Sequence, residues 1–282
     1  MLVKSDQIKH DVERLVESII SRGQSLDAVA QRLRTPQILS AFNKWDNKSW
    51  CRSVAGDALV RLRLFTEQNF NFIETMGVIS VARYIFELST WLKLFELDPR
   101  YGLVYYHQLL DTQEHHFRAV RSQLRREVTM LKSFDEREKE SQGEVLENSK
   151  GVSSATLLSS LKTISDVIDT EASRGFSIYA KDAQVNGYGF QAFLVESKAI
   201  PQVEQALSDI ADERRKFDAT VPQDVKDLIP RRWQWRQMAE KVGLVDEYDY
   251  IYSFTSKLLH ATPASITTDQ KNLELPEIRV FL

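Results

Sequence analysis

The stretch from residue 98 to residue 139 reads DPRYGLVYYHQLLDTQEHHFRAVRSQLRREVTMLKSFDEREK. After Gly102 it contains neither glycine nor proline, the two residues that a helix interior tolerates least. Asp98 is a good N-cap and Pro99 suits a first turn, so we predict one long helix from about residue 98 to about residue 139. The later part of this stretch is heavily charged, which indicates that it projects into solvent or pairs with another chain.

The whole chain shares this shortage of turn residues. Its 282 residues include only 10 glycines and 7 prolines, which is about half of average usage. Sandwiches, propellers and barrels need a turn every 8 to 12 residues or so, and this composition argues against them. The sequence therefore predicts an all-α protein built as a multi-helix bundle.

Glycine and helical periodicity also indicate how the chain is organised. The polar segment SQGEVLENSKGVSS at 141–154 predicts a linker. Half of the glycines lie between Gly143 and Gly189, so we expect an irregular insertion over about 141–200. The predicted parts are an N-terminal helical extension over 1–48, a helical domain over 49–270 and a C-terminal tail over 271–282.

The bulk charge is close to neutral, with 37 Lys and Arg against 40 Asp and Glu and a net charge of −3. This is not the basic footprint of a general nucleic-acid binder, so contact with RNA would need a local patch. The single cysteine, Cys51, excludes an intramolecular disulfide and a Cys-based zinc site, and we expect a buried, unreactive thiol.

The apolar segments are too interrupted for a membrane protein. The most apolar stretch, 77–97, contains four charged residues, and the N-terminus carries charges throughout instead of a signal-peptide core. We therefore expect a cytoplasmic protein without a membrane span.

A polar stripe on the apolar helix expected at about 76–97 is the first candidate site. At 100° per residue, Arg83 and Glu87 fall within about 80° of Ser80 and Thr90. A helix that is apolar nearly all round is buried, so this stripe must be paired or face a cavity. Two interpretations stay open: a structural ion pair between Arg83 and Glu87, or a functional groove.

The second candidate lies on the helix expected at the end of the chain, EYDYIYSFTSKLLHATP at 247–263. Tyr252, Ser256 and His260 follow one another at intervals of four residues. Ser253 and His260 lie about 20° apart around the helix axis. A histidine in a last turn also suits the helix dipole, so a structural role for His260 remains an alternative.

The segment RRWQWR at 231–236 interleaves cations with aromatic rings, a pattern that suits base stacking and phosphate contact. The alternative interpretation is that Trp233 packs in the core while Arg231, Arg232 and Arg236 stay solvated. No Glu-x-x-His pair accompanies His115 and His116, and no glycine-rich phosphate loop occurs. We therefore expect neither a metal nor a cofactor.

Arg83-x3-Glu87, together with the ending MAEKVGLVDEYDYIYSFTSKLLHATPAS at 238–265, resembles a family of bacterial proteins of unknown function. That family is similar to the HEPN superfamily (higher eukaryotes and prokaryotes nucleotide-binding), helical bundles that include ribonucleases of toxin and phage-defence systems. The resemblance covers roughly residues 53–268 and implies the same helical fold there.

The superfamily's ribonucleases use an Arg-x4–6-His motif, often in a cleft shared by two protomers. The resemblance implies that His260 takes the place of the histidine, which acts as general acid and base. The arginine of this motif is missing here. The three positions at which it would stand before His260 hold Ser253, Phe254 and Thr255. Lys257 lies too close to His260, so Arg83 is the candidate to stabilise the phosphorane charge.

The resemblance thus implies a non-catalytic or weakly active module that binds RNA or a protein partner of a toxin–antitoxin or phage-defence system. One alternative is a metal-independent ribonuclease that uses His260, Arg83 and Glu87, and another is a purely structural scaffold. A homodimer fits either of the first two interpretations. The candidate binding residues are Tyr252, Ser253, Ser256, Lys257, Arg231, Arg232 and Arg236.

Overall fold

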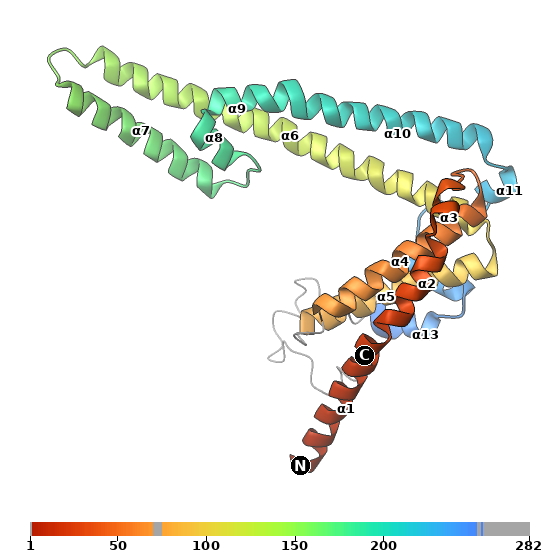
Figure 1. Cartoon of the computed structure of the whole chain (residues 1–282). Coiled ribbons are helices and arrows are strands. Elements are labelled where there is room, and N and C mark those ends of the chain that lie inside the picture. The colour runs from red at the N-terminus through yellow and green to blue at the C-terminus, as the bar shows by residue number, and fades with distance from the viewer. Residues whose placement is uncertain (1, 70–74, 253–254, 256–282) are drawn as a thin grey trace. The chain divides into compact units, whose positions relative to one another are not determined.

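The structure is a computed structural model, and it describes residues 2–69, 75–252 and 255. Within those ranges the chain is all-α and has no strand, which confirms the predicted fold class. The helices are α1 (Leu2–Ser21), α2 (Gly23–Leu33), α3 (Pro36–Ser40), α4 (Asn47–Asn69), α5 (Thr75–Leu97), α6 (Tyr101–Glu147), α7 (Ser154–Arg174), α8 (Ala180–Asn186), α9 (Tyr188–Leu194), α10 (Ile200–Thr220), α11 (Gln223–Lys226), α12 (Trp235–Lys241) and α13 (Val245–Glu247), with π-helical turns η1 (Val195–Ala199) and η2 (Tyr248–Tyr252) (Figure 1).

The chain divides into two compact units. Unit 1 comprises Met1–His107 and Thr220–Leu282, and unit 2 comprises Gln108–Ala219. No division falls at the boundary expected at residue 48, because α2 packs along α4 and so joins the N-terminal helices to unit 1. The boundary expected at 270 and the C-terminal tail expected at 271–282 lie outside the described residues. The segment 141–200, expected to be irregular, is helical over most of its length.

Helix α6 continues to Glu147, beyond its expected end near residue 139. The Ser165 hydroxyl of α7 donates to the Glu138 carboxylate at 2.6 Å just before the extra turns, and residues 144 and 145 of those turns line a shared pocket with the start of α7. Packing of this kind outweighs the cost of about 1 kcal/mol that a glycine such as Gly143 brings to a helix interior. The connection to α7 is therefore short, and Ser153 caps α7 by accepting from the Thr156 amide at 3.2 Å.

The core of unit 1 is built around α5, whose Ile79 and Leu94 are fully buried. The first turn of α6 crosses α4 at Gly102, where a Cβ atom would stand 2.2 Å from the Asn47 carbonyl oxygen. Glycine is required at this crossing because any side chain would overlap the α4 backbone. On the other side of α5, a small cluster joins Phe86 to Ala239 of α12.

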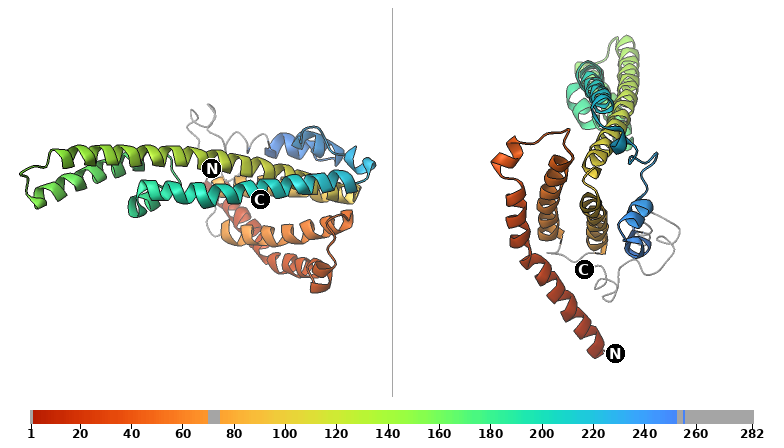
Figure 2. Two further views of the ribbon diagram at one scale, coloured as in Figure 1. Left: turned by 90° about the horizontal axis from the view of Figure 1, so that it is seen from above. Right: turned by 90° about the vertical axis from the view of Figure 1, so that its right-hand side faces the viewer.

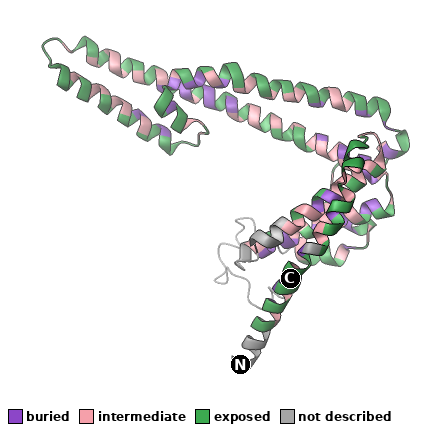
Figure 3. Ribbon diagram, viewed as in Figure 1, coloured by how far each residue is buried: buried purple, intermediate pink, exposed green. Residues whose placement is uncertain are grey.

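Unit 2 consists of the longer part of α6 with α7 to α10, and Figures 1 and 2 show α10 running alongside α6. Its core gathers where α6, α7, α8, α9 and η1 meet, as the buried positions in Figure 3 show. The buried members are Leu124, Val128, Leu131, Phe134, Ile168, Ala172, Ala183, Tyr188, Ala192 and Val195. Salt bridges line the edges of this core, for example Lys132 with Glu196 at 2.9 Å.

Among the described residues, no helix combines the length and the apolar character that crossing a membrane requires.

Candidate functional site

Arg83, Glu87 and Tyr252, all singled out from the sequence, meet in unit 1. The Arg83 guanidinium donates to the Glu87 carboxylate at 3.1 Å and to the Tyr252 hydroxyl at 3.0 Å. It also lies 4.4 Å from the centre of the Tyr252 ring, within the range of a cation–π contact. The structure thus brings together residues 169 positions apart in the chain.

Local sequence explains how Tyr252 reaches this place. Gly243 adopts a φ of +70°, a left-handed conformation that glycine takes readily, and it ends the turn after α12. The π-helical turn η2 then stacks Tyr248 on Tyr252 with ring centres 4.8 Å apart, and both rings lie near Phe86. Burial raises the pKa of the Tyr252 hydroxyl, and the adjacent Arg83 guanidinium opposes this shift.

The chemistry of this cluster is that of a satisfied ion pair. The Arg83 and Glu87 side chains are 24% and 29% exposed, and their opposite charges cancel. Thr90, the next polar residue along the stripe, is fully buried and donates to the Phe86 carbonyl of its own helix. This geometry favours the structural interpretation of the stripe over an open groove.

Several predicted site residues, namely Ser253, Ser256, Lys257 and His260, lie outside the described residues. Within the described part, Thr255 is buried and its hydroxyl donates to the Tyr252 carbonyl at 3.3 Å.

The RRWQWR segment uses its aromatic rings for packing. Trp233 stacks on Trp91 with ring centres 4.3 Å apart and an interplanar angle of 14°. One face of the Trp233 ring is therefore already covered, which favours packing over base stacking. Arg231 and Arg232 are exposed, and Arg236 lies 3.7 Å from Glu240. Helix α12 begins only at Trp235, so the first four residues of the segment precede it.

In the part of the chain that the structure describes, no three His, Cys, Asp or Glu side chains form a group that could hold a metal ion.

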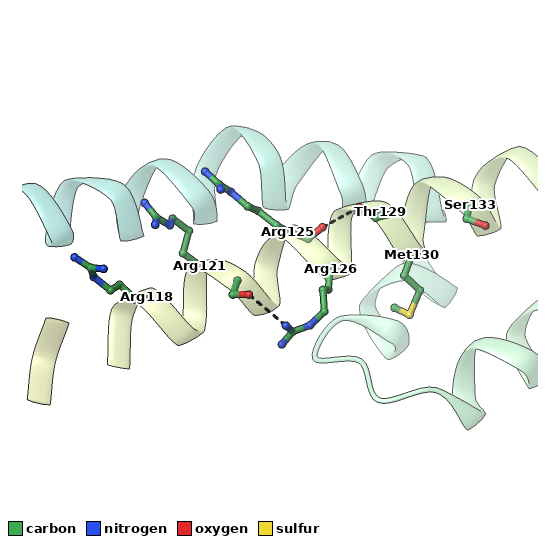
Figure 4. Close-up of a pocket in the computed structure, with 8 residues that line it drawn as sticks. Arg118, Arg121, Arg125, Arg126, Thr129, Met130 and Ser133 are labelled. Atoms are coloured by element: carbon green, nitrogen blue, oxygen red, sulfur yellow. Dashed lines mark hydrogen bonds between the residues drawn. The ribbon is translucent and has the colours of Figure 1, made fainter. Parts of the chain in front are cut away.

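A basic groove on α6, which the sequence showed only as a charged stretch, is the second site. It has a volume of about 690 Å³ and lies entirely in unit 2 (Figure 4). We call it the arginine groove, and it is lined by Arg118, Arg121, Ser122, Arg125, Arg126, Thr129, Met130 and Ser133. None of these described lining residues is acidic.

Helical geometry explains how the lining is arranged. At 100° per residue, Arg118, Arg121 and Arg125 fall within about 60° of one another, and Arg126 follows about 80° beyond Arg118. The hydroxyl residues of the groove lie between these flanks. Figure 4 agrees, because Arg118, Arg121 and Arg125 extend to one side of α6 and Arg126 extends to the other. The opposite face of α6 carries Leu124, which packs into the core of unit 2.

The four arginines differ in how far their charges are neutralised. Arg118 pairs with Glu114, and Arg125 lies 3.2 Å from Glu204 of α10. Arg126 instead donates to neutral groups, Ser122 Oγ and Gln123 Oε1. Among the described residues, Arg121 makes no ion pair. Two guanidinium groups thus reach the groove without a carboxylate to neutralise them.

The sequence did contain a signal for this groove. The run RAVRSQLRR at 118–126 has four arginines and no acidic residue, although the flanking sequence holds both signs of charge. The sequence did not show which face of this helix packs against α7 to α10. That buried face determines which arginines are exposed to solvent together.

Comparison of the chain with protein-family models, with curated proteins and with solved structures gives no match.

Proposed function

We propose that this protein is a non-catalytic RNA-binding module that holds the phosphate backbone in the arginine groove. The observation that carries this proposal is the groove itself, with four arginines and no acidic residue in its described lining. It supplies the local basic patch that RNA contact requires in a chain with a net charge of −3.

The residue types in the groove suit phosphate. Arginine presents a planar fork of donors that matches a phosphate oxygen pair, and it loses less hydration than lysine on binding. Ser133 adds a hydroxyl of the kind that contacts phosphate oxygens. The side chains of Arg118 and Arg125 are 64% and 61% exposed, so an entering phosphate can compete with Glu114 and Glu204 for them.

The test is the salt dependence of binding to labelled RNA, measured by fluorescence anisotropy. Four phosphate contacts predict a slope of about −2.8 for log K against log salt on single strands, which is about a 50-fold loss of affinity from 50 to 200 mM salt. The double variant Arg121→Gln/Arg126→Gln should reduce the slope to about −1.4 and that loss to about sevenfold.

A matched control removes the same charge from the same helix outside the groove. Arg137→Gln/Lys139→Gln does so, since these residues pair with Glu171 and Asp135. RNA binding that the control keeps and the groove variant loses supports the proposal. Absence of RNA binding by the wild type, or equal losses in both variants, overturns it. Binding of polyglutamate in place of RNA would assign the groove to an acidic protein partner.

The resemblance to the HEPN superfamily supports a setting for this module. On that basis we place it in the cytoplasm, as a homodimer, in a toxin–antitoxin or phage-defence system. Purification from the native host, with sequencing of co-purified RNA and mass determination by light scattering, tests the setting. A monomer without enriched RNA contradicts it.

A metal-independent ribonuclease is the second candidate, favoured by the contact between Arg83 and Tyr252. Tyr252 contacts Arg83 and precedes His260, the candidate acid–base residue, by only eight residues. Cleavage of RNA in the presence of EDTA, abolished in His260→Ala and reduced in Arg83→Lys, is the expected result. A wild-type protein that cleaves no RNA contradicts this candidate and leaves the binding proposal intact.

A further inference from the structure

The loop between α7 and α8, residues 175–179, is fixed against α6 beside the arginine groove. Glu127 of α6 is buried to 1% exposure, and its carboxylate accepts from the Ser177 hydroxyl at 2.6 Å and from the Ile178 amide at 2.9 Å. Gln123 donates to the same carboxylate at 2.8 Å. A buried carboxylate with several donors holds its partners firmly, since each bond to a charged group is stronger than a neutral one.

The other end of this loop lies close to the groove lining. A Cβ atom on Gly175 would stand 3.9 Å from the Met130 sulfur, and Met130 lines the groove. Arg126, the groove residue next to Glu127 in the chain, extends toward the same side of α6 as this loop (Figure 4). The loop therefore lies beside the edge of the groove that Arg126 and Met130 form, and we call this edge the rim.

Phe176 stands between these two anchor points and is 85% exposed. Its backbone neighbours are held by Glu127 and packed near Met130, so the ring is presented to solvent from a fixed position. A large aromatic side chain this exposed, beside a basic groove, is the arrangement that proteins use to bind single-stranded nucleic acid. There, cations track the backbone while an aromatic ring stacks on a base.

We infer that Phe176 is a base-stacking residue and that the substrate class of the arginine groove is single-stranded RNA. This inference rests on the RNA binding proposed above. An unpaired base can turn toward the rim and cover the Phe176 ring while its flanking phosphates lie on Arg126 and its neighbours. In a duplex the bases are stacked inside the helix, so a ring at the rim gains nothing from them.

The experiment compares single-stranded and double-stranded RNA of the same sequence on the full chain. Phe176→Ala should weaken single-strand binding about tenfold, the effect expected for losing one stacked base. Its effect on duplex binding should stay below about twofold, and Phe176→Trp should restore single-strand binding. The control is Phe190→Ala, which removes another exposed phenylalanine of unit 2, on α9.

The outcomes separate this inference from the proposed function. Wild-type protein that prefers single strands and loses that preference in Phe176→Ala alone supports the inference. Wild-type protein that binds RNA equally well as single strand and duplex, with no loss in Phe176→Ala, overturns it while the groove remains an RNA site. Wild-type protein that binds neither form overturns the proposed function and the inference with it.

Discussion

Two glycines of α6 should respond to the same substitution with opposite signs. At Gly102, an added Cβ atom would stand 2.2 Å from the Asn47 carbonyl oxygen and 3.1 Å from the Cys51 sulfur. At Gly143, it would meet nothing within 4 Å. Gly102 lies in the first turn of α6 and Gly143 near its end, so the two substitutions contrast a close approach to α4 with an open position on the same helix.

The magnitudes follow from the geometry. Gly143→Ala should stabilise the helix by about 1 kcal/mol, the propensity difference between alanine and glycine. Gly102→Ala gains at most this amount, since Gly102 lies in the first turn, and the obstructing atom belongs to the backbone, which cannot turn aside as a flexible side chain does. Overpacking of this severity costs about 3 kcal/mol or more, so we expect a net destabilisation of about 2 kcal/mol.

Urea unfolding followed by two signals measures both changes. Every tryptophan lies in unit 1, so fluorescence reports that unit and circular dichroism reports the helices of both. With a slope of about 2 kcal/mol per molar urea, Gly102→Ala should lower the fluorescence midpoint by about 1 M, and Gly143→Ala should raise the dichroism midpoint by about 0.5 M. A Gly102→Ala protein as stable as the wild type would refute the crossing of α4 and α6 described here.

Three further predictions test individual groups. Burial raises the pKa of the Cys51 thiol to about 11, so iodoacetamide at neutral pH should alkylate it about a hundredfold more slowly in the native protein than in urea, as mass spectrometry can follow. The raised pKa of Tyr252 means that the folded state favours the neutral phenol. The contribution of this group to the free energy of unfolding is complete below about pH 10 and is lost as the pH rises through the pKa of the folded state. Tyr252→Phe should therefore cost about 1 kcal/mol at neutral pH and less at alkaline pH, measured by tryptophan fluorescence in urea, and an equal cost at both would contradict the burial of this hydroxyl. Glu127→Ala should lower the dichroism midpoint and speed chymotrypsin cleavage in the α7–α8 loop, whereas Glu136→Ala, an exposed acid of the same helix, should do neither.

The shortage of glycine and proline predicted the fold class, and spacing along one helix predicted part of the first site. The interval of four residues between Arg83 and Glu87 predicted a pair, and the structure contains that pair. The apolar surroundings of Arg83 predicted burial, because a polar stripe on such a helix needs a partner. What spacing does not provide is the helix that packs alongside, so the bond from Arg83 to Tyr252 emerges only from the tertiary structure.

The arginine groove shows a different limit of sequence reasoning. Glu127 follows Arg126 directly in a charged run, and from composition alone it looks like one more solvated acid that balances the arginines. In the structure Glu127 is buried, and its carboxylate accepts hydrogen bonds from the α7–α8 loop. The arginines lose that negative charge from their face of the helix. Helical periodicity already places Glu127 about 100° beyond Arg126, on the side of α6 that carries core residues such as Leu131. What periodicity does not provide is the loop some 50 residues further along the chain, which donates hydrogen bonds to this carboxylate.

The net charge of the protein and the charge of the groove therefore have to be judged over different distances. The groove spans about 22 Å along α6, from the rise of 1.5 Å per residue between residues 118 and 133. At physiological ionic strength the Debye length is about 8 Å, so acidic residues elsewhere on the chain are screened from a phosphate held at Arg121. The carboxylates near the groove are Glu114 and Glu204, each of which pairs with an arginine of the groove, and the buried Glu127, which accepts hydrogen bonds from the α7–α8 loop. A chain with a net charge of −3 can thus offer a phosphate chain a locally positive surface, because the two uncompensated guanidinium groups decide the potential within one Debye length of the bound backbone.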